Sequence, residues 1–417
     1  FYYLVFLKLI KLCMKFQKSF FSIIFLLSCA VLFSQIKDPS SIYRKERDKI
    51  NNLVHTKLKV DFNFEKKELN GEEWLTLEPH FYPTNRVVLD AKAMIIQTVS
   101  LDDKNLDYTY DGYQLTIELP KEYKKGEHYT LYLKYIARPE KVKDKGSIAI
   151  TAAKGLYFIN STGSDPNKPT QIWTQGETEA NSCWFPTIDS PNQKTSQEIY
   201  ITVPKKFKTL SNGILVSQEN SGSNRTDYWK FDQKHAPYLI FMGVGEYEVI
   251  EDSYKNIPVN YYVEKKYASL AREIFGLTPE MIGFFETKLG VNYPWNKYSQ
   301  IVAREYVSGA MENTTAVIHG EFVQMTDREL LDNHQDDIIA HELFHHWFGD
   351  LVTCESWANL PLNESFATYG EYIWREKGFG RMEADMHLDA DLNNYLRESK
   401  SKKVDMIRFE HVLKFRY

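Results

Sequence analysis

Cysteine is scarce in this chain, with four residues among 417. This shortage excludes a fold held together by a disulfide framework. Cys13 and Cys29 lie near the N-terminus, which leaves Cys183 and Cys354 in the remainder of the chain. These two could pair in an exported protein, but the pattern favours buried thiols that act as small apolar side chains. Neither has the spacing of a zinc-ligand set.

An excess of charge of one sign is also missing. The chain has 51 basic and 56 acidic residues and a formal net charge of −5. No basic stripe is present, so the sequence offers no electrostatic footprint for nucleic acid, and we expect no such partner. Repeats and low-complexity segments are absent too. The 43% hydrophobic and 14% aromatic content suffices for sizeable cores in about two to three domains.

A hydrophobic run long enough to cross a bilayer is missing as well. The apolar run at residues 20–33 is shorter than the span of about 20 residues that a bilayer needs. Met14, Lys15 and Lys18 precede this run, which is typical of a signal peptide. We therefore assign residues 1–13 to upstream translation, 14–34 to a signal peptide and 35–49 to a linker.

This assignment predicts an exported protein, periplasmic or secreted, with no stable membrane span after signal cleavage. Two alternatives stay open. The segment Leu26 to Cys29 resembles a lipoprotein box, although apolar residues continue beyond Cys29. An uncleaved anchor is the other alternative.

The hydrophobic period changes near residue 248. From 50 to 247, apolar and polar residues alternate, which predicts an N-terminal antiparallel β-sandwich or saddle. From 248 to 417 the pattern is mostly helical, so the chain has an α+β multidomain fold. The predicted strands are 58–64, 113–119, 131–136, 198–203, 300–304 and 311–319. The predicted helices are 267–275, 279–289, one around His341, one from Pro361 to Gly378, and 381–397; residues 400–403 are a solvated charge run.

The most informative motif is His341-Glu342-Leu343-Phe344-His345. On a helix, positions i and i+4 share one face, so both imidazoles can bind one ion. Catalytic zinc takes three protein ligands and a water. Glu364, in the first turn of the next predicted helix, is the candidate third ligand, and Glu342 the candidate general base. The pattern predicts a hydrolase with one Zn²⁺ ion.

Plainer explanations exist for each part of this motif. Two solvated histidines on a surface helix would show the same spacing, and the dipole of a helix N-terminus alone favours an acid such as Glu364.

For the helix that contains His341, the sequence predicts a cap at Asp332 or Asn333 and an end at Gly349. His346 is expected to point away from the metal, in a packing or supporting role. His319 and His334 are expected to be structural.

Several segments together resemble the M1 aminopeptidases, the aminopeptidase N family. His341-Glu342-x-x-His345, eighteen further residues and Glu364 resemble the family's gluzincin pattern. Residues 308–313 resemble its GAMEN signature, and residues 174–177 and 184–189 resemble the segment where the N-terminal domain reaches the active site. The resemblance extends from about residue 50 to 410. It implies that residues 248–417 are a thermolysin-like catalytic domain.

The resemblance also implies roles. Glu177, Glu312 and Glu364 are expected to hold a free α-ammonium, and Gly309, Ala310 and Met311 to pair with substrate in strand fashion, next to Gln175. The implied protein is a zinc aminopeptidase that releases N-terminal residues from peptides. Without the family, Glu177 is an ordinary loop acid and Glu312 an edge-strand charge.

One expected residue has no counterpart in this sequence. The family supplies a tyrosine that stabilises the oxyanion, well beyond the third metal ligand. The sequence ends at Tyr417, before that point. We therefore expect a catalytic domain truncated at its C-terminus and an activity reduced or lost in this chain. Two alternatives remain open: a hydrolase of the same fold with another substrate class, such as epoxides, and an inert fragment that acts as a binding module.

Overall fold

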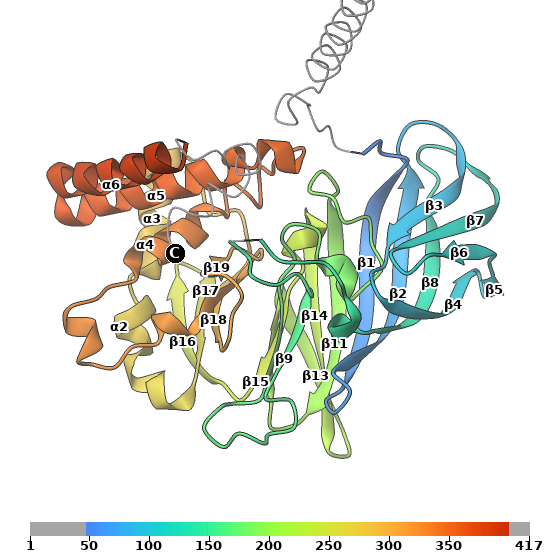
Figure 1. The fold of residues 1–417 in the computed structure, drawn as a ribbon, viewed down its shortest axis with the longest axis horizontal. Coiled ribbons are helices and arrows are strands. Elements are labelled where there is room, and N and C mark those ends of the chain that lie inside the picture. The colour runs from blue at the N-terminus through green and yellow to red at the C-terminus, as the bar shows by residue number, and fades with distance from the viewer. Residues whose placement is uncertain (1–46, 148, 400–417) are drawn as a thin grey trace, which may run out of the picture. The chain divides into compact units, whose positions relative to one another are not determined.

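Residues 47–147 and 149–399 are described by the computed structural model (Figure 1). The expected upstream segment 1–13, the signal peptide 14–34, most of the linker 35–49 and the charge run 400–403 lie outside the described residues. A β-rich part comes first in the chain and a mostly helical part follows. The predicted fold class is therefore confirmed. Among the described helices, none combines the length and the apolar character that a membrane span requires.

Three sheets make up the β-rich part. The largest has eight strands in the order β13-β14-β11-β1-β2-β8-β4-β5, and the others are β12-β15-β10-β9 and β3-β7-β6. The strands are β1 (Asn51–Asn63), β2 (Glu68–Pro79), β3 (Thr84–Asp90), β4 (Met94–Leu101), β5 (Lys104–Asn105), β6 (Tyr108–Tyr110), β7 (Gln114–Tyr123), β8 (Tyr129–Ala137), β9 (Leu156–Ile159), β10 (Gln171–Thr174), β11 (Thr195–Pro204), β12 (Lys208–Ser211), β13 (Ile214–Ser221), β14 (Asn224–His235) and β15 (Met242–Gly245). Short 3₁₀ helices are η2 (Pro139–Lys141), η3 (Asn181–Cys183) and η4 (Pro237–Leu239).

The antiparallel pairing predicted for the β-rich part fails at one pair of strands. β1 runs parallel to β11, in a register that places Leu58 opposite Ile199. The alternating sequence pattern reports that one face of each strand is buried, and this holds in β11, where buried and half-buried residues alternate. The alternation does not show whether neighbouring strands run parallel or antiparallel, because side chains alternate with a period of two in both kinds of sheet.

One charged residue faces the apolar core of the large sheet. Glu73 on β2 is fully buried, and both its carboxylate oxygens lack a hydrogen bond. Its neighbour Tyr135 on β8 is also buried, and the tyrosine ring lies over Gly71, where any Cβ would come within 2.2 Å of it. Burial raises the pKa of Glu73 well above its usual value. The native state therefore keeps a proton on Glu73 at a pH where the unfolded chain has lost it.

Replacing Glu73 by methionine is expected to raise the free energy of unfolding by about 1–3 kcal/mol at neutral pH, because an unpaired buried polar group is removed at similar volume. The folded pKa of Glu73 lies above the unfolded one, so the wild type loses stability as the pH rises above about 4.5. The gain in the free energy of unfolding from Glu73→Met therefore increases with pH.

Urea unfolding of both proteins at several pH values measures this gain. Glu72→Met, on the opposite, half-exposed face of β2, is the control; an equal gain there would contradict the account.

The second part is built on a five-stranded sheet with the order β16-β17-β18-β20-β19. Its strands are β16 (Glu248–Tyr254), β17 (Ile257–Val263), β18 (Tyr298–Ala303), β19 (Ala310–Met311) and β20 (Ala316–Gly320). Its helices are η5 (Lys265–Leu270), α2 (Ala271–Phe275), α3 (Thr278–Leu289), η6 (Glu321–Val323), η7 (Glu329–Leu331), α4 (Asp336–Phe344), η8 (Trp357–Asn359), α5 (Pro361–Phe379) and α6 (Arg381–Ser399). In Figure 1, α5 and α6 run side by side.

Three local predictions for this part are wrong. The expected strand 311–319 is a hairpin of β19 and β20, broken by a turn in which Thr315 has φ 67°. The metal helix begins at Asp336 without a side-chain cap, later than the expected cap at Asp332 or Asn333, and ends at Phe344, earlier than Gly349. The helix that begins at Pro361 passes Gly378 and ends before Gly380, whose φ of 86° a residue with a side chain rarely adopts.

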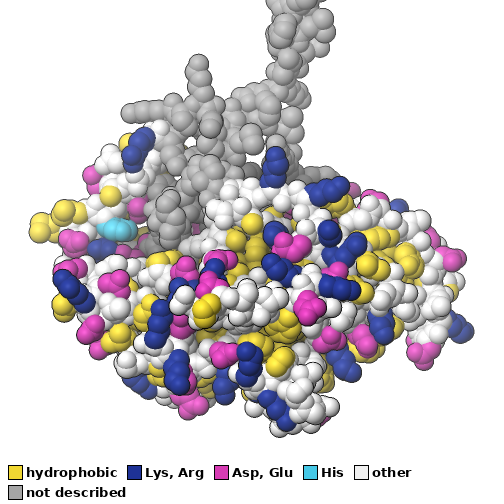
Figure 2. Space-filling model, turned by 60° about the horizontal axis from the view of Figure 1, so that its bottom comes forward, with side chains coloured by type: hydrophobic (Ala, Val, Ile, Leu, Met, Phe, Trp, Pro, Cys, Tyr) yellow, Lys and Arg dark blue, Asp and Glu magenta, His cyan; other side chains and the backbone are white. Residues whose placement is uncertain are grey.

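Acidic and basic residues are nearly equal in number in the sequence, and they are mixed on the surface as well (Figure 2). On the face shown in Figure 2, acidic and basic side chains are interspersed among apolar and polar ones, without a continuous region of one sign. Both described cysteines, Cys183 and Cys354, are buried and unpaired, as the sequence favoured.

Candidate functional site

Helix α4 brings the two predicted histidine ligands to one side. Asp336 and Asp337 occupy its first turn, where acidic side chains stabilise the positive end of the helix dipole. His341 lies in its last turn and His345 directly follows it, with ring centroids 4.7 Å apart. Gly349 is needed here, because a Cβ at this position would approach Nδ1 of His345 to 2.9 Å.

Hydrogen bonds at Nδ1 of each ring fix the orientation of the two imidazoles. Nδ1 of His341 lies 2.5 Å from Oε1 of Glu371 on α5, and Nδ1 of His345 lies 3.0 Å from the carbonyl oxygen of Phe348. Both partners accept a hydrogen bond from Nδ1–H, so Nε2 is the nitrogen of each ring that can bind a metal ion. Partners of this kind orient metal-binding histidines and fix their tautomer.

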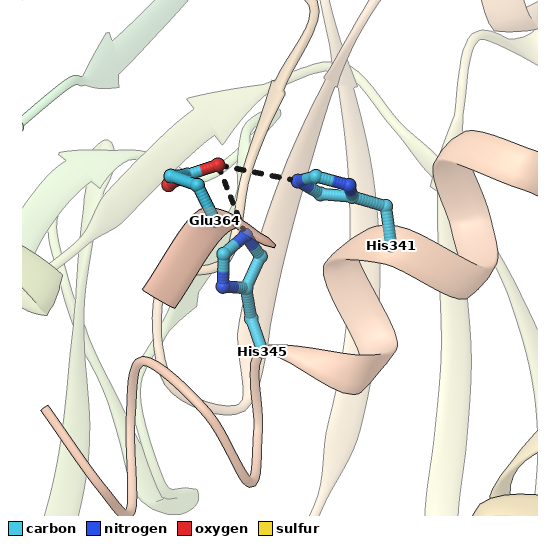
Figure 3. A group of neighbouring side chains, drawn as sticks. All are labelled: His341, His345 and Glu364. Carbon is cyan, nitrogen blue, oxygen red and sulfur yellow. Dashed lines mark ion pairs between the residues drawn. The ribbon is translucent and has the colours of Figure 1, made fainter. Parts of the chain in front are cut away.

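Glu364 on α5 completes the group (Figure 3). Its Oε2 lies 3.4 Å from Nε2 of His341 and 3.6 Å from Nε2 of His345. Oε2 is buried and makes no hydrogen bond. Helix α5 reaches this position because Gly370 packs on the ring of Phe344, where a Cβ would come within 2.6 Å.

These three residues fit a zinc ion. Their ligand atoms lie within 4.8 Å of one another, and all three side chains are buried. Two imidazole nitrogens and one carboxylate oxygen are a donor set typical of catalytic zinc. A buried carboxylate oxygen without a hydrogen bond is costly unless a cation binds it. The structure thus brings together the three residues that the sequence predicted as metal ligands.

Three further carboxylates surround this group. Glu312, in the turn after β19, and Glu342 on α4 have ligand atoms within 4.8 Å of His345. Glu177 follows β10 and is 5% exposed, and its Oε1 makes no hydrogen bond. It is close enough that Glu364 and Glu312 affect its ionisation. The site therefore concentrates negative charge at the contact between the two parts of the chain.

The ionisation of these groups reflects the crowding. Burial, Glu364 and Glu312 raise the pKa of Glu177 well above its ordinary value. Burial acts to lower the pKa of His345, but the nearby Glu312 and Glu364 carboxylates outweigh it and raise that pKa well above 6.5. Burial opposes ionisation of Glu364 as well, yet the His345 and His341 imidazoles lower its pKa to about 2. The neighbouring carboxylates thus favour the protonated form of His345 in the metal-free chain.

The predicted substrate-binding residues lie next to this acidic cluster. β19, with Ala310 and Met311, is the outermost strand of its sheet, and the Gly309 carbonyl accepts a hydrogen bond from Gly320 N–H at its start. Nε2 of Gln175 lies 3.3 Å from Sδ of Met311. Gln175 also accepts a hydrogen bond from the hydroxyl of Tyr306.

The geometry agrees with the supporting roles predicted for His346 and His319, whereas His334 is exposed. His346 is fully buried, its Nε2 accepts a hydrogen bond from Thr315 N–H at 3.1 Å, and its Nδ1 lies 3.1 Å from the carbonyl oxygen of Glu342. Burial lowers the pKa of His346 to about 3. His319 is buried against Gln300, at 2.9 Å.

Sequence reasoning missed three residues of the site. Glu371 follows Glu364 by seven positions, and this i,i+7 spacing on one helix face was an available signal. Tyr238 and Asn363 were missed as well. The Tyr238 hydroxyl donates to Oε1 of Glu312 at 3.3 Å and accepts from Nδ2 of Asn363 at 3.2 Å. Tyr238 lies far from Glu312 in the sequence, and no local pattern connects them.

Two family models match consecutive parts of this chain. Residues 52–239 match the family described as Peptidase M1 N-terminal domain, and residues 274–414 match the Peptidase family M1 domain. Together the two matches cover most of the chain.

Curated relatives are longer than this chain. A probable aminopeptidase 1 of Saccharolobus solfataricus is 28% identical over 340 residues, which are 79% of this chain and 41% of the relative. Aminopeptidase N of Haemonchus contortus is 27% identical over 348 residues, 80% of this chain and 35% of the relative. The chain thus spans about two fifths of the length of these relatives.

Solved structures share the fold. The crystal structure of an M1 zinc metallopeptidase from Deinococcus radiodurans superposes with a TM-score of 0.68 at 20% sequence identity, covering 85% of this chain and 76% of that protein.

Proposed function

Because this chain belongs to peptidase family M1, we propose that it is the zinc-binding part of an aminopeptidase that releases N-terminal residues from peptides. The observation that carries the proposal is the buried group of His341, His345 and Glu364. Within it, Oε2 of Glu364 faces the two histidine Nε2 atoms and makes no hydrogen bond. The names of the relatives, probable aminopeptidase and aminopeptidase N, support the same reaction.

His341, His345 and Glu364 would hold one zinc ion. Bound zinc supplies Lewis-acid polarisation, which makes a water more acidic and a carbonyl more electrophilic. The Glu342 carboxylate takes the proton of the attacking water and returns it to the leaving amine. Glu342 suits this role because its carboxylate lies within 4.8 Å of a ligand atom of His345.

The remaining acids bind the end of the substrate. Glu177, Glu312 and Glu364 are buried, and Glu364 and Glu312 are close enough to affect the ionisation of Glu177. Together they attract the α-ammonium of a peptide N-terminus. Opposite charges about 4 Å apart interact by roughly 4 kcal/mol at an effective dielectric constant of 20, before desolvation. An internal peptide bond carries no ammonium, so this cluster selects chain ends.

The edge strand β19 orients the substrate backbone. Ala310 and Met311 pair with β20 on one side only, so an extended peptide can add as the next strand. Gly309 and Gln175 border the same edge. We also propose that the protein is exported, on the strength of the signal-peptide pattern at residues 14–34.

Hydrolysis of amino-acid 4-nitroanilides by the zinc-loaded protein tests the proposal. Anilides with a free α-ammonium are expected to be cleaved, and their N-acetylated counterparts to be cleaved at least about tenfold more slowly. Equal rates on both would contradict selection of chain ends, and cleavage of none of a broad panel would contradict the aminopeptidase proposal.

A further inference from the structure

We propose that Tyr238 is a positioning residue that sets the spacing of the acids that bind the substrate's α-ammonium. The inference rests on the proposed function and adds a residue from the β-rich part to its machinery. Tyr238 belongs to η4 and is 1% exposed.

The hydroxyl of Tyr238 connects two elements of the second part. It donates a hydrogen bond to Oε1 of Glu312 and accepts one from Nδ2 of Asn363. Asn363 is adjacent to Glu364 in the first turn of α5, and its Oδ1 accepts from the N–H of Cys354 at 3.0 Å. One hydroxyl thus fixes both the Glu312 carboxylate and the turn that carries Glu364.

The backbone around Tyr238 holds the third acid. Nδ2 of Asn181 donates to the carbonyl oxygens of Pro237 at 2.7 Å and Ile240 at 2.9 Å. Asn181 follows Glu177 by four residues. Gly176 packs directly on this segment, because a Cβ there would lie 2.1 Å from the carbonyl oxygen of Tyr238. The loop that contains Glu177 therefore packs directly against residues 237–240.

A second asparagine holds this segment against the turn after β19. Nδ2 of Asn212 donates to the carbonyl oxygens of Leu239 at 2.8 Å and Thr314 at 2.7 Å, and its Oδ1 accepts from the N–H of Phe241. Thr314 lies two residues beyond Glu312. Residues 237–241 are thus fixed on both sides, and the Tyr238 hydroxyl has little freedom to move.

Through these contacts, residues 237–241 determine how far Glu177, Glu312 and Glu364 lie from one another. Three acids crowded in a buried site repel one another, so their separation needs a rigid support. The Tyr238 hydroxyl touches neither zinc ligand atoms nor the base Glu342 in the described contacts, so its effect is on binding of the substrate end rather than on proton transfer.

The test compares Tyr238→Phe with the wild type in the zinc-loaded full chain. Phenylalanine keeps the ring, which packs edge-on against Trp357 at 5.0 Å, and removes only the hydroxyl. Calorimetry with L-leucinamide, in chains that also carry Glu342→Gln so that the amide is not cleaved, is expected to show about tenfold weaker binding, because a buried hydrogen bond to a carboxylate is lost. The zinc stoichiometry is expected to stay at one. In anilide hydrolysis, KM rises by the same factor, whereas kcat changes by less than about threefold.

Tyr247→Phe is the matched control, since the Tyr247 hydroxyl is buried in the same part of the chain and makes no hydrogen bond. Its leucinamide affinity is expected to equal that of the wild type. Equal binding by wild type and Tyr238→Phe would overturn the role of Tyr238. So would a Tyr238→Phe chain that loses zinc or fails to fold, because Tyr238 would then support the fold as a whole. Failure of the wild type itself to bind leucinamide in preference to N-acetyl-leucinamide would contradict the proposed function.

Discussion

Replacing Glu342 by glutamine is expected to lower kcat for amino-acid anilides by about 10²–10⁴-fold, the usual contribution of a general base. Glutamine has the same shape but accepts no proton from water at neutral pH. The zinc content is expected to remain one per chain, because His341, His345 and Glu364 hold the ion without Glu342. Zinc analysis and steady-state kinetics on the same sample measure both quantities.

The control for this change is Glu248→Gln, an exposed acid on β16 far along the chain from the site. Its kcat is expected to match that of the wild type. Hydrolysis retained at a near-normal rate by Glu342→Gln would remove Glu342 from the role of base. Loss of zinc together with activity would instead make Glu342 a metal ligand.

Zinc affinity is expected to rise about tenfold per pH unit as long as His345 is protonated in the metal-free chain. The pKa of His345 is raised well above 6.5, because the nearby Glu312 and Glu364 carboxylates outweigh the effect of burial. Zinc binds neutral imidazole, so binding expels that proton. The carboxyls of Glu177 and Glu312, whose pKa values are also raised, release protons in the same direction. A lower pH therefore weakens zinc binding.

Calorimetric zinc titrations in two buffers of different ionisation enthalpy count the released protons. At least about one proton per zinc is expected near pH 6–7. His334→Ala, at an exposed position, is expected to release the same number. A zinc affinity independent of pH, with no proton release, would show that His345 is neutral before zinc binds or is no ligand.

The helix period predicted part of the site from the sequence alone. His341 and His345 are four residues apart, and helical geometry is enough to place their rings on one side. Glu364 is different, because its distance from the histidines depends on how α5 packs on α4. That packing uses Gly370 against Phe344; the sequence shows a glycine there but not its partner. The sequence motif therefore named Glu364 as a candidate ligand, and the family's gluzincin pattern supported the choice, but neither gave its distance from the histidines.

Apolar spacing identifies α5 as a helix but does not identify all of its buried residues. Phe366, Tyr369, Tyr372 and Ile373 recur at helical spacing in the sequence, yet Phe366 and Tyr369 are 42% and 55% exposed. The buried face carries Ala367 and Gly370 instead, since small side chains allow the close approach to α4. Periodicity reports that a helix is amphipathic, but close helix packing can place the smallest residues inside.

The family resemblance placed Glu177 of the β-rich part at the site, but the contact of Tyr238 with Glu312 was beyond sequence reasoning. Tyr238 meets Glu312 only because η4 of the β-rich part lies against the turn after β19. The parallel pairing of β1 with β11 is similar, since the residues between them form other strands before the chain returns. Both features are tertiary, and no local period encodes them.

X-ray absorption at the zinc edge, with metal analysis of the purified chain, tests the central claim most directly. We expect one zinc ion per chain, bound by two imidazole nitrogens and a carboxylate oxygen, and we expect His345→Ala to lose it. A wild-type chain that binds no zinc under loading conditions, or a zinc that stays fully bound in His345→Ala, would contradict that claim.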